Sequence, residues 1–284
     1  MRATLSAELS VEALADLARL DLDPTGLRRT FDAAAAPRLR KAIALLRDAR
    51  LQRGPGAFLV PAAALATLPE AKRSSAGLAL LLALGSPVPQ NDAGDLAVRV
   101  VDEGQRMTSG GRYHKSNEGG ELHTDGPQYQ VPPRYIGLVC VRPASVGGAS
   151  KLVDAHAVHR EIEARAPESL AALYQPFHFH QKPGPRTVVA PIFARDEDTS
   201  ELRIRYLGEY VRSGHAVAGV PLSAEAARAL GVLDRVLADD AMALRFSLDA
   251  GDVLVIDNHR MLHGREAFED AGAKREMLRI WVRP

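Results

Sequence analysis

The chain has 284 residues, of which 46% are hydrophobic and 25% charged, an ordinary balance for a globular protein. Its 36 basic and 35 acidic residues give a formal net charge of +1, which excludes the global basic field typical of nucleic-acid binding. No stretch approaches the roughly 18 apolar residues that span a bilayer, and no apolar signal segment follows the first residues. The single cysteine, Cys140, cannot form an internal disulfide, which fits a reducing compartment. We therefore expect a cytoplasmic protein with no membrane or nucleic-acid partner, and we leave a homo-oligomer open.

The first third of the chain is predicted to be mainly helical. Ser10 is a capping residue ahead of apolar residues at helical spacing, and residues 31–51 form an amphipathic pattern with arginines opposite the leucines. A short strand is expected at 57–60. Residues 62–84 are helical again, with an expected interruption near 72–77. The pattern of the first third of the chain thus predicts a helical layer rather than a β domain.

From residue 96 the apolar period changes to that of short strands separated by glycine and proline turns. Helices are expected only at 157–173 and 223–241. The expected strands are 96–101, 135–141, 147–153, 176–181, 187–193, 202–206, 244–248, 253–256 and 277–282. The pattern predicts a mainly β fold with helical additions, a β-sandwich or jelly roll. No linker divides the chain, so we expect one domain over 1–284, with residues 1–95 as a helical N-terminal layer on the β core.

The motif His123-Thr124-Asp125 places two strong metal ligands two residues apart. In an extended segment the side chains of residues i and i+2 point to the same face, so His123 and Asp125 can hold one ion. His263, which follows a strand, a Gly-Asp turn and a second strand, is the best candidate for a third ligand. Two imidazoles and one carboxylate suit non-haem Fe(II) oxygen chemistry.

Arginines recur every fourth residue near the C-terminus, at Arg275, Arg279 and Arg283. On a strand these three share one face with Met277 and Trp281, while the other face carries Leu278, Ile280 and Val282. Arginines on the inner face of a sheet need anionic partners, and an anionic co-substrate supplies one because guanidinium binds a carboxylate through two hydrogen bonds. The alternative interpretation is an edge strand with solvated arginines.

Four segments together carry a resemblance to a known family. They are His123-Thr124-Asp125, residues 147–150 (GGAS), residues 258–268 (NHRMLHGREAF) and residues 275–281 (REMLRIW). In their order and spacing, this set resembles the taurine dioxygenase/TfdA-like family of Fe(II)- and 2-oxoglutarate-dependent dioxygenases, within the clavaminate synthase-like superfamily. The resemblance runs from about residue 96 to the end of the chain and extends weakly over the N-terminal region.

The resemblance implies a double-stranded β-helix (jelly-roll) core and an oxidoreductase that uses Fe(II), 2-oxoglutarate and O₂. It implies that the iron ligands are His123, Asp125 and His263. The co-substrate leaves as succinate and CO₂ when an unactivated C–H bond of the substrate is oxidised. Because Asp125 is retained as a carboxylate, hydroxylation or desaturation is expected rather than chlorination.

The resemblance also implies a site for 2-oxoglutarate. Arg275, the first arginine of the Arg-x-x-x-Arg pair, would bind the distal carboxylate of the co-substrate. Ser150 stands where the family often has a serine or threonine that helps to bind this carboxylate. Arg279 would lie nearer the substrate or the metal end of the co-substrate.

The substrate is expected to be a small polar molecule, amino-acid-like by analogy with the family. The glycine-rich loop before the metal motif supplies candidate contacts, with Asn117 and Glu118 suited to an amine or hydroxyl and Arg112 suited to an acid. His178 is expected to line the substrate pocket. His178 and His180 also have the i, i+2 spacing of a rival metal pair, although no nearby carboxylate completes it.

The sequence is also compatible with two other classes of function. One is another metal-dependent jelly-roll enzyme, a hydrolase or isomerase, against which the spaced arginines argue. The other is a non-catalytic jelly-roll protein that binds a small molecule. Metal binding and stabilisation by 2-oxoglutarate separate the three.

Overall fold

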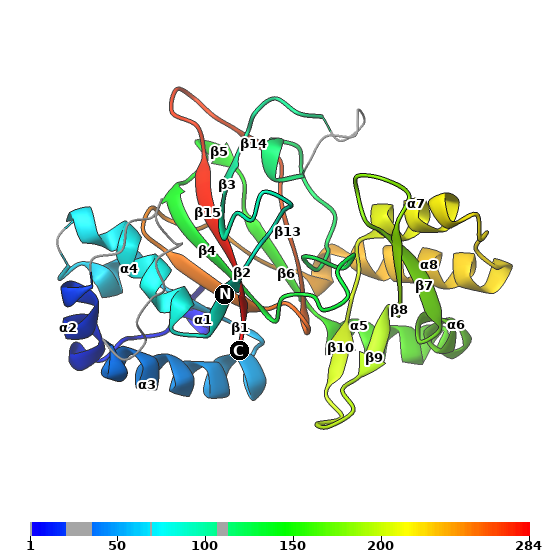
Figure 1. Cartoon of the computed structure of the whole chain (residues 1–284), viewed down its shortest axis with the longest axis horizontal. Coiled ribbons are helices and arrows are strands. Elements are labelled where there is room, and N and C mark those ends of the chain that lie inside the picture. Colours follow the sequence, from blue (N-terminus) through cyan, green and yellow to red (C-terminus); the bar gives the residue numbers. More distant parts are fainter. Residues whose placement is uncertain (1, 21–35, 69, 107–112) are drawn as a thin grey trace.

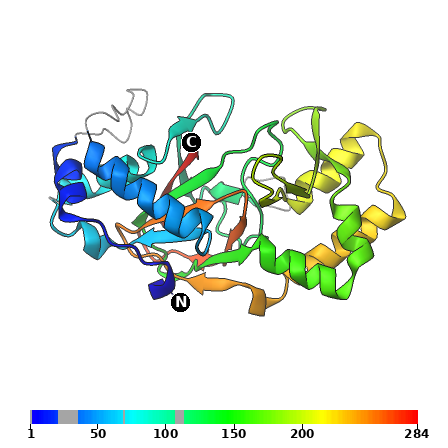
Figure 2. The ribbon, with the colours of Figure 1, turned by 90° about the horizontal axis from the view of Figure 1, so that it is seen from below.

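The computed structural model describes residues 2–20, 36–68, 70–106 and 113–284. They form three regions side by side, seen in two views at right angles (Figures 1 and 2): a helical layer from the N-terminus, a central pair of β-sheets, and a lobe of helices and small sheets. The central sheets contain the jelly-roll interior, and the other two regions cover their outer faces.

The N-terminal layer covers the outer face of the large sheet. Its helices are α1 (Arg2–Leu5), α2 (Val11–Arg19), α3 (Pro37–Leu46) and α4 (Glu70–Leu82). The predicted cap is confirmed, because the Ala13 amide donates to the Ser10 hydroxyl at 3.3 Å. Leu39, Ile43 and Leu81 pack in one apolar cluster with residues of the sheet.

The interruption expected near 72–77 is wrong, because α4 runs through that stretch. The polar stretch finds partners within the fold: the Lys72 ammonium donates to the Ala18 carbonyl, and the Ser75 hydroxyl donates to the Lys72 carbonyl. The break comes earlier, after a short 3₁₀ turn at Ala62–Leu65.

The large sheet has six antiparallel strands in the order β1-β12-β4-β15-β2, with β3 also paired to β15. Its strands are β1 (Ala57–Val60), β2 (Ser86–Val88), β3 (Ala97–Val101), β4 (Tyr135–Arg142), β12 (Val253–Asp257) and β15 (Glu276–Arg283). The short strand β2, which begins Ser-Pro, was not predicted, since proline weakens the sequence signal for a strand. As it pairs only with β15, it forms an edge where proline is tolerated.

The smaller sheet faces the large one across the interior. It consists of β11 (Leu244–Phe246), β6 (Ser150–Asp154) and β13 (Met261–Arg265), next to the short pair β5 (Val146–Gly147) and β14 (Phe268–Glu269). Apolar residues of both sheets meet in one cluster, whose members include Ile136, Leu152, Phe246, Met261, Met277 and Trp281. The alternation predicted for the last strand is confirmed: Met277 and Trp281 face this interior, while Ile280 and Val282 pack against the helical layer.

The lobe on the right of Figure 1 is the chain between β6 and β11. Its elements are α5 (Ala155–Arg165), α6 (Pro167–Leu173), β7 (Pro176–His180), β8 (Thr187–Pro191), β9 (Phe193–Arg195), β10 (Leu202–Ile204), α7 (Gly208–Ala218) and α8 (Ala224–Leu237). The single helix expected at 157–173 is two helices, which part at Ala166, the residue before a proline.

Helix α7 was not predicted. It begins without a side-chain cap and contains two glycines, which lower helix propensity. Gly214 is explained by packing on β7, because a Cβ atom there would lie 2.2 Å from the His178 carbonyl oxygen.

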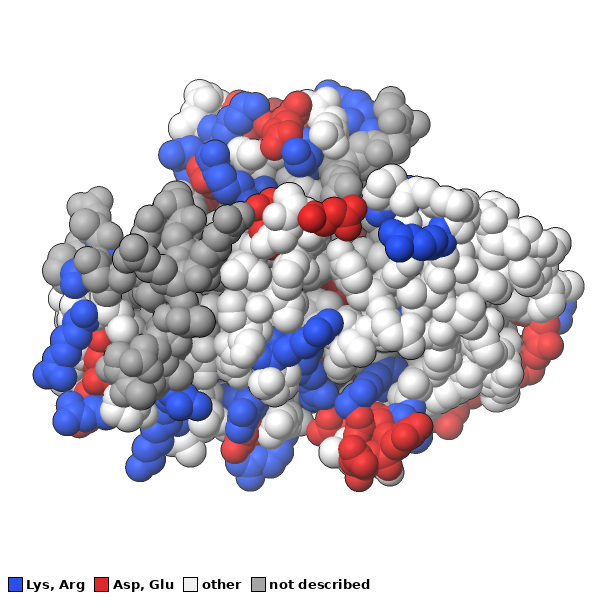
Figure 3. Space-filling model, in the orientation of Figure 1, with Lys and Arg blue, Asp and Glu red and all other residues white. Residues whose placement is uncertain are grey.

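No helix within the described ranges is long and apolar enough to cross a membrane. On the face drawn in Figure 3, lysines and arginines are interspersed with acidic side chains along the lower edge, and much of the lobe on the right is uncharged.

Candidate metal centre and neighbouring pockets

His123 and His263 lie directly opposite each other although they are far apart in the sequence. The His123 amide donates to the His263 carbonyl at 2.9 Å, and the His263 amide donates to the His123 carbonyl at 2.8 Å. Residues paired in this way present their side chains on the same face of a ladder. The two imidazole centroids are accordingly 4.6 Å apart. His263 therefore stands within strand β13, which is not among the strands expected from the sequence.

Asp125 completes a cluster of three buried side chains. Its Oδ1 atom lies 3.6 Å from His123 Nε2 and 3.8 Å from His263 Nε2. The three side chains offer ligand atoms that all lie within 4.8 Å of one another, and no other such group occurs among the residues that the structure describes. Two imidazole nitrogens and a carboxylate oxygen are the donor set of a non-haem Fe(II) site, so the residues present fit this metal.

Hydrogen bonding and burial keep the histidines ready to bind a cation. The His123 Nδ1 atom bonds the Glu121 carbonyl at 2.8 Å, which orients Nε2 toward Asp125. Burial, followed by the neighbouring His123, lowers the pKa of His263 to about 3. The His263 ring is thus neutral at physiological pH, the form that coordinates metals.

Asp125 is ionised despite its burial. Burial by itself would raise the pKa of this carboxyl, but the Arg279 guanidinium and the two histidines hold it well below its usual range. The Arg279 Nη1 atom lies 3.1 Å from Oδ2, and the Trp281 indole donates to Oδ2 at 2.8 Å. Both partners come from β15, the strand on which the sequence placed a row of arginines.

Arg275 lies in a different environment. It is 5% exposed, and its guanidinium makes no hydrogen bond or ion pair with any residue that the structure describes. It packs over the Phe268 ring, as Arg265 also does, at 5.3 and 4.5 Å from the centroid. Burial, followed by the charge of Arg265, lowers the pKa of Arg275 to about 10. The Asp270 carboxylate accepts from the Arg275 backbone amide at 3.0 Å, but among the described residues no carboxylate pairs with the guanidinium. A buried guanidinium of this kind is a fitting receptor for a ligand carboxylate.

The Gly-Gly-Ala-Ser segment runs beside this arginine. A Cβ atom on Gly148 would lie 3.4 Å from Arg275 Nε, so the glycine permits a close approach. Ser150 is buried and stands opposite Arg265 in the ladder between β6 and β13. The structure therefore brings the two segments proposed for 2-oxoglutarate to one place.

A pocket of about 320 Å³ is lined by two side chains of the triad, His123 and Asp125. Its described lining combines His123, Asp125, Arg279 and Trp281 with polar side chains from loops, a 3₁₀ turn and the start of helix α7: Gln90, Asn91, Asp92, His114, Gln128, Lys182, Glu209 and Tyr210. The side-chain oxygen of Gln128 is buried and has no hydrogen-bond partner among the described residues. This pocket is the natural place for a small substrate.

The residues predicted to contact substrate are not part of this described lining. The Arg106 guanidinium donates to the Asn117 side chain at 3.0 Å and lies 3.7 Å from the Glu118 carboxylate. His178 is in the lobe, where its Nδ1 atom bonds the Thr187 hydroxyl at 3.1 Å. Arg112 lies outside the described residues. The substrate roles of these four residues stay predictions.

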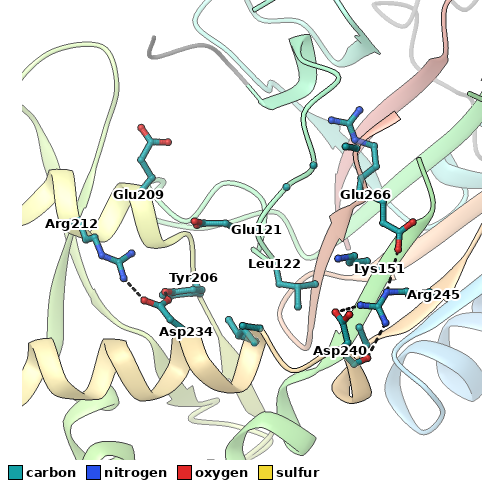
Figure 4. A pocket seen from close by; sticks show the side chains of 17 residues that line it. Glu121, Leu122, Lys151, Tyr206, Glu209, Arg212, Asp234, Asp240, Arg245 and Glu266 are labelled. Atoms are coloured by element: carbon teal, nitrogen blue, oxygen red, sulfur yellow. Dashed lines mark hydrogen bonds and ion pairs between the residues drawn. The ribbon is translucent and has the colours of Figure 1, made fainter. Parts of the chain in front are cut away.

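A second and larger cavity, of about 830 Å³, lies between the smaller sheet and helices α7 and α8 (Figure 4). Its lining includes Glu121 but no side chain of the triad. Arg212 pairs with Asp234, and Arg245 pairs with Asp240. Because most of its charges pair with each other, we assign this cavity no ligand.

Comparison with known proteins decides the family. A model of the taurine catabolism dioxygenase TauD, TfdA family matches residues 32–281. The chain belongs to this family. The resemblance found in the sequence is therefore confirmed.

Curated dioxygenases are similar to part of the chain. The chain is 27% identical over 170 residues to a gamma-butyrobetaine dioxygenase of Pseudomonas sp. (strain AK-1). This match covers 57% of this chain and 42% of that protein. The chain is 31% identical over 147 residues to a uridine-5'-phosphate dioxygenase of Amycolatopsis sp., which covers 50% of this chain and 52% of that protein. The matched segments thus span about half the length of these relatives.

Solved structures share the fold over nearly the whole chain. An asparagine oxygenase in complex with Fe(II), 2S,3S-3-hydroxyasparagine and succinate is 21% identical with a TM-score of 0.72, and the match covers 98% of this chain and 93% of that one. The non-heme iron oxygenase OrfP in complex with Fe and alpha-ketoglutaric acid is 19% identical with a TM-score of 0.69, over 98% and 93% of the two chains. The mainly β, jelly-roll fold predicted from the sequence is confirmed.

The roles of several residues around the candidate site were not predicted from the sequence. The Asn258 side chain, buried between Asp257 and His259, bonds the main chain of Asp125 at two points. Trp281 was placed on the correct face, but nothing in the sequence marked it as a partner of Asp125. Gln128 lies in a loop without a motif. Two signals were available: Asn258 and Trp281 both belong to segments that carry the family resemblance, and Trp281 is the only tryptophan and lies between two of the spaced arginines.

Proposed function

We propose that this chain is an Fe(II)- and 2-oxoglutarate-dependent dioxygenase that hydroxylates, or desaturates, an unactivated C–H bond of a small polar substrate. One observation carries the proposal: a preassembled His-Asp-His cluster stands in the same interior as Arg275, a buried arginine whose guanidinium has no ion pair with any described residue. The cluster matches the donor set for Fe(II), and the arginine matches a dicarboxylate co-substrate. Membership of a dioxygenase family supports the same conclusion.

Each residue has a separate task in this proposal. His123, Asp125 and His263 hold the metal; Arg275, with Ser150, binds the distal carboxylate of 2-oxoglutarate. Arg279 keeps Asp125 ionised and borders the pocket, where it meets the co-substrate or substrate from the Asp125 side. With Fe(II), 2-oxoglutarate and O₂ bound, the centre supplies an oxidant for C–H bonds, and the co-substrate leaves as succinate and CO₂. The surrounding apolar cluster limits the access of water to this interior.

The substrate is inferred to be amino-acid-like. The pocket beside the triad is small, and its polar lining offers amide, carboxylate and hydroxyl groups that suit an amine or amide. Structurally similar proteins include an asparagine oxygenase solved with a hydroxylated asparagine, and OrfP solved with (3S)-hydroxy-L-Arg. The buried, unpaired oxygen of Gln128 needs a hydrogen-bond donor, which an ammonium or amide group provides.

A thermal-shift experiment tests the proposal. Under anoxia, Mn(II) or Fe(II) should raise the Tm, and 2-oxoglutarate should raise it further only when metal is present, because a ligand that binds the folded state alone stabilises it. Asp125→Ala should lose the metal response. A hydrolase or isomerase would respond to metal but not to 2-oxoglutarate, and a non-catalytic binding protein would respond to neither. Screening amino acids for succinate release then identifies the substrate.

We also infer a cytoplasmic location, since the lone cysteine is buried and no disulfide stabilises the described structure. The partner is proposed to be a small molecule rather than nucleic acid or a membrane, in line with a net charge near zero.

A further inference from the structure

The main chain of Asp125 is held by a single side chain from the turn between β12 and β13. The Asp125 amide donates to Asn258 Oδ1 at 2.7 Å, and Asn258 Nδ2 donates to the Asp125 carbonyl at 2.9 Å. The same Nδ2 atom donates to the Pro133 carbonyl at 2.9 Å. Asn258 is only 1% exposed, so these bonds do not compete with water. The turn that leads into the His263 strand is thereby tied to the segment that carries Asp125.

The carboxylate of Asp125 is held separately by Trp281. The indole Nε1 donates to Oδ2 at 2.8 Å, while Oδ1 faces the two imidazoles. Arg279 does not choose between the oxygens, because its Nη1 atom lies 3.2 Å from Oδ1 and 3.1 Å from Oδ2. An indole N–H can only donate, and Trp281 is buried in the interior cluster. The choice of oxygen therefore comes from Trp281 and the charge balance from Arg279.

We propose that Asn258 and Trp281 are the positioning residues of the metal centre. Asn258 fixes the main chain of Asp125, and Trp281 reserves Oδ2, so that Oδ1 alone is offered to the metal. The inference rests on the proposed function, because it takes the triad as a metal site. A carboxylate that binds through one oxygen leaves more coordination positions open for the co-substrate and O₂ than one that binds through both.

Packing offers the competing explanation for Trp281. Its ring lies in one cluster with Ile136, Cys140 and Met277, so a substitution could act through the core alone. Met277 provides a matched control, because it is on the same face of β15 and in the same cluster but makes no hydrogen bond with Asp125. Met277→Ala removes packing and leaves the indole bond in place.

The decisive experiment measures Mn(II) affinity by the EPR signal of free Mn(II), together with the Tm of the metal-free full chain. Trp281→Phe keeps an aromatic ring and removes the N–H group. We expect this variant to bind Mn(II) roughly 10- to 100-fold more weakly, the usual effect of losing a hydrogen bond to a metal ligand. Met277→Ala should lower the Tm but leave the Mn(II) affinity unchanged.

Asn258 is tested with an optical probe that the chain already contains. Trp281 is the only tryptophan and contacts Asp125, so its fluorescence should respond when Mn(II) or Co(II) reaches the carboxylate. In Asn258→Ala the same response should require roughly tenfold more metal. Asn258→Asp keeps an acceptor for the Asp125 amide but loses both donated bonds. Like the alanine variant, it should therefore bind metal more weakly than the wild type.

The outcomes separate this inference from the proposed function. If Asp125→Ala binds Mn(II) as tightly as the wild type, the metal site itself is wrong. If Asp125→Ala loses Mn(II) while Trp281→Phe and Asn258→Ala retain wild-type affinity, the metal site stands and the positioning roles are overturned. Equal losses of affinity in Trp281→Phe and Met277→Ala would reduce Trp281 to a packing residue.

Discussion

The metal triad and the Arg275 site share one interior but differ in how their charges are partnered. Asp125 is bonded to Arg279 and Trp281, so its negative charge is balanced before any metal arrives. The Arg275 guanidinium has no hydrogen bond or ion pair with any described residue, although Arg275 is as buried as Asp125. The charges of the metal triad are partnered in advance, whereas the Arg275 guanidinium has no ion pair within the described structure.

The difference has an energetic meaning. Burying an unpaired charge costs free energy, and that cost is recovered when an oppositely charged ligand binds. The triad should therefore hold its geometry in the metal-free protein. The Arg275 site should instead weaken the free protein and tighten the co-substrate complex. Substitutions in the two regions are expected to have opposite effects on stability.

The largest expected effect is that of Asp125→Ala. It removes a metal ligand and also leaves the partly buried Arg279 guanidinium without its carboxylate partner, so succinate formation should fall to the level of the metal-free protein and the Tm should drop. Succinate release and thermal unfolding measure the two effects. Asp198→Ala, in an exposed turn of the lobe, serves as the control and should match the wild type in both. An active Asp125→Ala variant would contradict the metal assignment.

Arg275→Met should behave in the opposite way toward stability. The variant cannot form the two charged hydrogen bonds proposed between Arg275 and the distal carboxylate of 2-oxoglutarate, so the requirement for 2-oxoglutarate should rise about 100-fold or more. The Tm of the free protein should nevertheless rise, because methionine fills the space over Phe268 without a buried charge. Thermal unfolding with and without 2-oxoglutarate tests both statements. A lowered Tm in the absence of ligand would mean that Arg275 already has a partner, and that the Arg275 site does not differ from the triad in the partnering of its charge.

Gln128→Ala extends the comparison to the substrate pocket. Like Arg275, the Gln128 side chain presents a buried group without a described partner, but its oxygen accepts a hydrogen bond instead of offering charge. Losing that bond should raise the substrate KM by about tenfold and leave the requirement for 2-oxoglutarate unchanged. The two constants are measured with whichever amino acid supports succinate release. An equal rise in both would indicate a general distortion of the pocket.

Ser150→Ala should have a smaller effect on the co-substrate. The hydroxyl is expected to supply one neutral hydrogen bond beside Arg275, worth about 1 kcal/mol, so the 2-oxoglutarate KM should rise about fivefold. Ser150→Thr retains the hydroxyl and should restore the wild-type value. If the alanine variant is unaffected, Arg275 binds the carboxylate without help from β6.

The sequence was informative wherever a short-range period decides which side chains share a face. Spacing by two placed His123 with Asp125, and spacing by four placed the arginines of β15 with Trp281. Contacts between distant segments left no such trace. The opposition of His123 to His263 follows from a ladder that no local pattern specifies. The bonds from Asn258 and Trp281 to Asp125 likewise depend on where two remote turns and strands meet.

His178 is a case in which a local pattern predicted a site that the described contacts do not show. Its substitution has the smallest expected effect. Its motif resembles a ligand pair, and a role in the substrate pocket was inferred, yet its ring bonds Thr187 and lies 5.1 Å from the His215 ring in the lobe. His178→Ala should therefore lower the Tm slightly, because it removes contacts between β7 and its neighbours, while the substrate KM stays at the wild-type value. Steady-state kinetics and thermal unfolding of this variant, measured beside Gln128→Ala, decide whether His178 acts in the lobe or in the substrate pocket. A raised KM with an unchanged Tm would return His178 to the substrate pocket and would require the lobe to move toward the triad when substrate binds.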